Sequence, residues 1–174
     1  YMEINYSDEL VVKGKKSIFL AGPTPRGENI TSWREEAVKI LENLSFDGLV
    51  YVPEYSTWKP KEDYVDQAMW ERNALLESTI IVFWVPREIP NMSGFTTNVE
   101  FGYWLHSGKV LYGRPDGAPK IKYLDWLYKE DYKKDIHTYL ESLLKEAVNL
   151  ANNSYHECNK SILPLEKRII IEES

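Results

Sequence analysis

Two glutamates stand beside apolar stripes of expected helices, where a carboxylate can do chemistry as well as meet solvent. Glu100 follows shortly after Thr96 and Thr97, and either hydroxyl could cap a helix by accepting from an orphan backbone N–H. The start of a helix favours negative charge, so we expect the Glu100 carboxylate to be ionised. Glu71 lies in the preceding helix, on one line with Gln67. Each glutamate could instead be a solvated surface group.

Two carboxyl groups in one pocket would suit reactions at a sugar carbon. An ionised carboxylate attacks that carbon through an oxocarbenium-like transition state, and a protonated carboxyl group assists the leaving group. Metal chemistry has weaker support, because His106, His137 and His156 are scattered and no pair has ligand spacing. A Ser-His-Asp triad would lack its nucleophile elbow. We therefore expect neither a metal nor a cofactor.

The loop at residues 22–27 breaks a short apolar run sharply and could form one wall of a pocket. It lacks the P-loop pattern, and its prolines offer no N–H to a phosphate. Thr24 and Arg26 could still hold a phosphate group. A plain tight turn is the alternative for Gly22 and Pro23.

Apolar runs alternate with helical patterns along the chain. The runs predict strands at residues 17–21, 49–52, 79–85 and 109–112. The helical patterns predict a helix after a cap at Thr31 or Ser32 and helices at 63–78, 97–107, 122–128 and 133–152. A further strand could lie around residues 11–12 or at 168–171. The predicted stripe of the 63–78 helix comprises Val65, Met69, Leu75 and Leu76.

Unbroken apolar strands separated by helices are typical of an α/β fold whose parallel sheet is covered on both faces. We expect four or five strands, with residues 80–85 near the middle of the sheet. Ligands bind such sheets at the carboxyl ends of the strands. The topology therefore predicts that Gly22, Glu54 and Glu100 converge.

Composition narrows the class of protein. The 174 residues suit a single domain, 1–174, with a core at about 17–150 and a tail at 151–174. The net charge of −6 and the lack of a basic block argue against a nucleic-acid polymer as partner. Cys158 is the single cysteine, which suits a reducing, cytoplasmic setting, and no apolar run suggests a membrane partner. Aromatic residues make up 13% of the chain and suit a stacking surface, a subunit interface or an ordinary core.

Seven short motifs, taken together, give the chain a family resemblance. It resembles the nucleoside 2-deoxyribosyltransferase-like family from about residue 17 to residue 150. The motifs are IFLAGPTP at 18–25, SWR at 32–34, VPE at 52–54, WE at 70–71, VFWVPR at 82–87, TTNVEFG at 96–102 and YLDW at 123–126.

The resemblance implies a flavodoxin-like (Rossmann-like) three-layer fold and a homo-oligomer with active sites near subunit contacts. It implies that Glu100 is the nucleophile that takes the sugar from a nucleoside and that Glu71 acts on the base. The substrates implied are a nucleoside or nucleotide and a free base. The residues expected to bind them are Gly22, Pro23, Thr24, Arg26, Glu54, Trp84, Asn98 and Gly102.

Three functions remain open. Transfer of deoxyribose between bases ranks first, and hydrolysis of the N-glycosidic bond, with water as acceptor, ranks second. Hydrolysis stays open because many family members carry Asp where this chain has Thr79, and because residues 91–95 lack the Asp found before the nucleophile in the transferases. A nucleotide-sensing module without turnover ranks third, because binding a neutral nucleoside would not require two buried acids.

Overall fold

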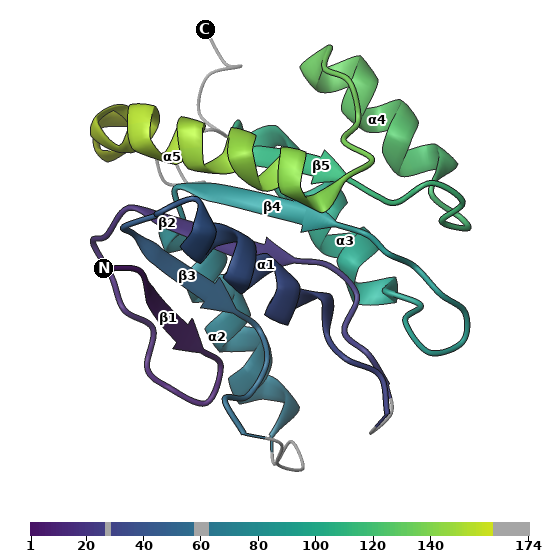
Figure 1. Ribbon diagram of the computed structural model, residues 1–174, viewed down its shortest axis with the longest axis horizontal. Coiled ribbons are helices and arrows are strands. Elements are labelled where there is room, and N and C mark those ends of the chain that lie inside the picture. Colours follow the sequence, from purple (N-terminus) through teal and green to yellow (C-terminus); the bar gives the residue numbers. More distant parts are fainter. Residues whose placement is uncertain (27–28, 58–62, 162–174) are drawn as a thin grey trace, which may run out of the picture.

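The sheet at the centre of the molecule has five parallel strands in the order β1-β3-β2-β4-β5. The structure, a computed structural model, describes residues 1–26, 29–57 and 63–161, with side chains up to residue 153 (Figure 1). The strands are β1 Glu3–Tyr6, β2 Ser17–Ala21, β3 Leu49–Val52, β4 Ile80–Trp84 and β5 Val110–Gly113. The helices are α1 Trp33–Asn43, α2 Tyr64–Glu77, α3 Phe95–Trp104 with a 3-10 turn at Leu105–Ser107, α4 Lys122–Tyr132 and α5 Leu140–Ser161.

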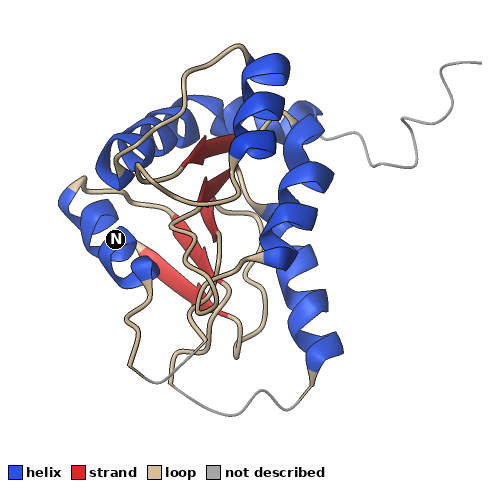
Figure 2. Ribbon diagram, turned by 90° about the vertical axis from the view of Figure 1, so that its right-hand side faces the viewer, coloured by secondary structure: helices blue, strands red, loops and turns tan. Residues whose placement is uncertain are grey.

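Helices cover both faces of the sheet, which confirms the predicted three-layer α/β fold (Figure 2). One buried cluster joins the sheet to α2, α3 and α4, and a second joins it to α1 and α5. Alternate residues of β4 enter opposite clusters: Ile81 and Phe83 face the first, and Val82 and Trp84 face the second. Because both faces are buried, the strand sequence is apolar at every position.

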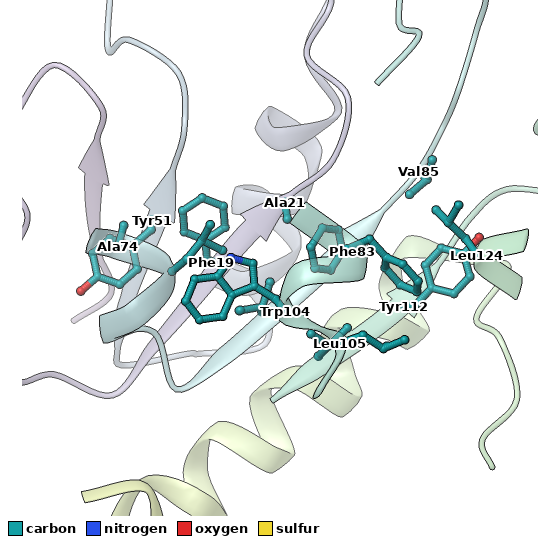
Figure 3. Close-up of a cluster of buried hydrophobic side chains, with 14 of the residues drawn as sticks. Phe19, Ala21, Tyr51, Ala74, Phe83, Val85, Trp104, Leu105, Tyr112 and Leu124 are labelled. Atoms are coloured by element: carbon teal, nitrogen blue, oxygen red, sulfur yellow. The ribbon is translucent and has the colours of Figure 1, made fainter. Parts of the chain in front are cut away.

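The cluster beneath α2, α3 and α4 is largely aromatic (Figure 3). Phe83 and Phe101 meet edge to face with their ring centroids 5.3 Å apart, and Phe101 lies 5.1 Å from Tyr112. Such pairs add about 0.5–1.5 kcal/mol beyond the area they bury. Phe101 therefore anchors α3, the helix that carries Glu100, to the middle of the sheet.

The fifth strand of the described sheet does not lie at the first of its two sequence candidates, around residues 11–12. It is β1, which pairs with β3 at the sheet edge, whereas Val11 and Val12 pack on the core without joining a strand. The Tyr51 hydroxyl donates to the Val12 carbonyl at 2.5 Å. A side-chain hydrogen bond, and not pairing with a strand, therefore holds Val12 in place. Residues 168–171 lie outside the described residues. The centre of the sheet is β2, and β4 lies next to it.

Two helix starts also differ from the prediction. The last long helix begins at Leu140, not at residue 133, because Lys133 ends α4 in a left-handed conformation and His137 bridges to Gly113 beside β5. The helix with Glu100 begins at Phe95. Its N-cap is Gly94 in the left-handed region (φ 63°), not a threonine hydroxyl.

The buried face of α2 is not the predicted one. Gln67, Trp70, Ala74 and Leu75 are buried, whereas Val65, Met69 and Leu76 are exposed. Several apolar side chains of this helix thus point away from the sheet, whereas Trp70 and Leu75 pack on it. Among the described residues, no helix is long and apolar enough to cross a membrane.

Candidate active site

A cavity of about 590 Å³ opens at the carboxyl ends of β2 and β3, where Ala21 and Pro53 line it. The β2–α1 loop, Arg34 of α1, the inner side of α2 and the start of α3 line it. This is the edge of the sheet at which parallel strands present their ligand sites. Glu71 from α2 and Glu100 from α3 are both in its wall.

The carboxyl groups of Glu71 and Glu100 lie within hydrogen-bonding reach of each other. A hydrogen bond between two carboxyl groups requires one proton. Burial and the charge of Glu71 raise the pKa of Glu100 from its ordinary 4.5 to about 8, although Arg34 acts in the opposite direction. The expectation that the helix start keeps Glu100 ionised is therefore wrong for the unliganded protein. The loss of solvation and the neighbouring carboxylate outweigh the helix dipole.

Gln67 holds the other carboxyl group of the pair. Its amide Nε2 donates to Glu71 Oε1 at 2.6 Å and, more weakly, to the Pro53 carbonyl at 3.4 Å. The hydrogen bond fixes the orientation of the Glu71 carboxyl group in the cavity wall. Because the pKa of Glu100 is raised to about 8, Glu100 keeps its proton at neutral pH.

Arg34 is the most deeply placed charge at the cavity, with 2% of its surface exposed. Its guanidinium donates to the Leu20 and Gly22 carbonyls at 2.9 and 2.7 Å and to Thr24 Oγ1 at 3.2 Å. It also donates to Glu54 Oε1 at 2.6 Å. The Arg34 side chain thus fixes the position of the β2–α1 loop.

Gly22 is at this position because nothing larger fits. A Cβ there would lie 2.1 Å from the Trp84 carbonyl oxygen and 2.8 Å from Trp33 Cζ2. Pro23, Thr24 and Arg26 follow it along the cavity wall. The backbone N–H of Arg26 donates to the Asn91 carbonyl at 2.9 Å, which ties the loop to the segment before α3.

Gly22 and Glu100 both line the cavity as predicted, whereas Glu54 pairs with Arg34 and does not line it. Three more of the expected substrate-binding residues do not line it either. Trp84 is buried on the opposite face of the sheet. Asn98 accepts from Arg87 through its Oδ1, and Gly102 is exposed on α3.

Arg34 and Gln67 are buried polar residues of the site to which the sequence analysis gave no role of their own. Both interrupt otherwise apolar stripes: Arg34 is in line with Ala37 and Leu41 of α1, and Gln67 precedes Trp70 in the buried face of α2. A polar residue within an apolar stripe of a helix is the sequence signal that could have identified both residues. Within residues 1–26, 29–57 and 63–161, no three His, Cys, Asp or Glu side chains gather as metal ligands would.

The fold and the carboxyl pair define a parallel α/β protein with an acidic cavity at its strand ends. The family model described as nucleoside 2-deoxyribosyltransferase like matches residues 15–118. The chain belongs to this family, and the match includes both glutamates. A comparison with curated proteins found none that matches.

Proposed function

We propose that this protein cleaves the N-glycosidic bond of a nucleoside or nucleotide through a covalent glycosyl ester of Glu100 and passes the sugar to a second base. The observation that carries the proposal is the hydrogen-bonded pair of Glu71 and Glu100 in the wall of one cavity. Family membership supports nucleoside-related chemistry of this kind.

The reaction requires the proton of the pair to lie on Glu71. In the first step a Glu100 oxygen forms a bond to the anomeric carbon, the bond from that carbon to the base nitrogen breaks, and the leaving base takes the proton from Glu71. In the second step the incoming base gives its proton to Glu71 as its nitrogen attacks the same carbon and the ester bond breaks. Two inversions leave the anomeric configuration unchanged.

Binding of substrate supplies a reason for the proton to move. The raised pKa of Glu100 keeps a proton on that carboxyl group at neutral pH. A basic nitrogen of the bound nucleobase beside Glu71 would favour a protonated carboxyl group there instead. The attacking carboxylate is then released next to the anomeric carbon. Enzymes use the proximity of paired groups in this way to convert a slow encounter into an internal step.

The β2–α1 loop is the proposed contact surface for the rest of the substrate. Gly22, Pro23, Thr24 and Arg26 line the cavity on this side, and Arg26 would suit the phosphate of a nucleotide. We propose a cytoplasmic homo-oligomer, because one cysteine suits a reducing compartment and exposed aromatic side chains surround the cavity mouth.

Hydrolysis is the second candidate. It shares the Glu100 ester and differs only in the acceptor, since water would give its proton to Glu71 and resolve the intermediate. The observation that favours it is the absence of an acidic side chain among residues 91–95, next to the nucleophile.

A panel of nucleosides and nucleotides, incubated with and without a second free base, tests the proposal. A new nucleoside that forms only when the second base is present supports transfer. Free base and free sugar support hydrolysis. Ligand-induced stabilisation without any product would overturn both and leave a sensing module.

A further inference from the structure

Arg34 occupies a position where helices normally carry apolar side chains. It lies in the buried stripe of α1, and its guanidinium uses Nε, Nη1 and Nη2 to reach four acceptors. Three of these acceptors, on Leu20, Gly22 and Thr24, are on the last residues of β2 and the loop that follows. The planar fork of an arginine can bridge them together, whereas the single ammonium of a lysine cannot.

The guanidinium also has one carboxylate partner. Glu54 Oε1 accepts from Arg34 Nη1 at 2.6 Å and from the Ser32 hydroxyl at 2.7 Å. Arg34 lines the cavity and Glu54 does not. A positive charge therefore lies at the cavity wall, and its negative partner does not line the cavity.

We propose that Arg34 is a positioning residue that holds the β2–α1 wall and keeps a positive charge beside Glu100, and that Glu54 sets how much of this charge acts on the cavity. This role deepens the proposed function, because an ionised Glu100 is the form that attacks. It also means that Glu54 binds Arg34 and does not bind the substrate.

The charged and titratable groups around Glu100 come from each segment that lines the cavity. Glu71, Arg72 and Tyr64 belong to α2, and Tyr103 belongs to α3 itself. Arg26 belongs to the β2–α1 loop and Arg34 to α1. Among them Glu71 raises the pKa of Glu100 and Arg34 lowers it.

Two substitutions remove one charge each and should act in opposite directions. Arg34→Met removes the positive charge, so Glu100 should keep its proton to higher pH. Glu54→Gln removes the negative charge but keeps an oxygen that can accept from both Ser32 and Arg34, so Glu100 should lose its proton at lower pH. We expect each shift to be about 0.5–1 pH unit.

Carbon-13 NMR of protein labelled at the glutamate carboxyl carbons measures the titration directly. Glu100→Gln assigns the Glu100 signal, and Glu141→Gln, an exposed change on α5, is the matched control with no expected shift. The readout needs no turnover, so failure of the proposed reaction and failure of this inference are separate results. In an active enzyme, the acidic limb of the pH profile of kcat/KM should move with the NMR titration.

Opposite shifts in Arg34→Met and Glu54→Gln support the proposal. Shifts in the same direction, or a Glu100 titration unchanged in both, would overturn it, since a purely structural arginine would not produce paired opposite effects. If Arg34→Met does not fold, Glu54→Gln alone decides: a titration that stays in place or moves to higher pH contradicts the proposal.

Discussion

Glu100 is the residue on which the proposed reaction depends most. Glu100→Ala removes the carboxylate that forms the ester, so turnover should fall on the order of 10³-fold or more while the fold persists. Mass spectrometry after incubation with a slow 2-fluorinated substrate analogue should show a sugar adduct on the wild-type peptide that contains Glu100. An adduct elsewhere, or full activity of Glu100→Ala, would remove Glu100 from the mechanism. Glu36→Ala, on the exposed surface of α1, is the control.

The effect of replacing Glu71 on the reaction rate should depend on how much the leaving group requires protonation. Glu71→Gln cannot donate a carboxylic proton, so substrates with poor leaving groups should slow by about 10²–10⁴-fold. Substrates with activated leaving groups should slow far less, and steady-state rates for both kinds measure the difference. Equal losses on both kinds of substrate would mean that Glu71 only positions the substrate.

The protonation of Glu100 also links stability to pH. Its pKa is about 8 in the folded protein and near 4.5 in an unfolded chain, so between these values the folded state binds more protons. The free energy of unfolding should therefore fall as the pH rises from about 4.5 to about 8. Glu100→Gln stays neutral and should remove roughly 3–4 kcal/mol of that fall between pH 5 and pH 8. Urea unfolding at pH 5 and pH 8 tests this, and an equal pH dependence in both proteins would contradict it.

At the scale of elements, substitution by alanine should lower the stability of the protein at one glycine and raise it at another. Gly22→Ala forces a Cβ against the Trp84 carbonyl and should cost about 1–3 kcal/mol or more. Gly102→Ala meets no atom within 4 Å and should gain up to about 1 kcal/mol, because alanine is the better helix former.

Urea denaturation of the two glycine variants gives the comparison. Full turnover is expected of Gly102→Ala, since Gly102 does not line the cavity. A destabilised Gly102→Ala or a stable Gly22→Ala would contradict the packing described for α3 and the β2–α1 loop.

The elements that sequence reasoning predicted best are those with a single dominant cause. β2, β3, β4 and β5 are unbroken apolar runs, because these strands are buried on both faces of the sheet. The stripe of α2 was predicted wrongly because Val65 and Met69 are apolar but exposed, whereas Gln67 is polar but buried beside Glu71.

The two glutamates of the site could be proposed from their position next to apolar stripes and from the family motifs. Their protonation could not, because it depends on a contact between residues 29 positions apart and on charges from a third helix. The helix dipole was the only influence on the pKa of Glu100 that could be inferred from neighbouring residues in the sequence. It is weaker than the combined effect of burial and the Glu71 carboxylate.

At the scale of the whole molecule, one layer carries most of the large apolar side chains that are exposed among the described residues. The exposed side chains of this layer are Tyr64, Val65, Met69 and Leu76 on α2, Phe95, Val99 and Tyr103 on α3, and Tyr123 and Trp126 on α4. Apolar groups gathered in this way are typical of protein interfaces. We therefore expect a homo-oligomer, at least a dimer, that contacts itself through this layer near the cavity mouth.

Analytical ultracentrifugation at micromolar concentration measures the oligomeric state. The double variant Val65→Glu/Met69→Glu places charge on the layer without touching the cavity lining and should shift the protein towards monomer. Leu10→Glu, also exposed but outside the layer, should leave the assembly unchanged. A monomeric wild-type protein would contradict the prediction.

The order of elements along the chain places both carboxylates in one continuous segment. Residues 63–107 comprise α2, β4, α3 and the turn after it, and they contain Glu71, Glu100 and Gln67. The proposed acid and the proposed nucleophile would thus be inherited together in any exchange of this segment between related genes. Arg34 and Glu54 lie outside it, so a chimaera would keep the carboxyl pair of one parent and take the surrounding charge from the other. Under the proposed mechanism, such an exchange would change the pH at which Glu100 ionises and leave the carboxyl pair itself intact.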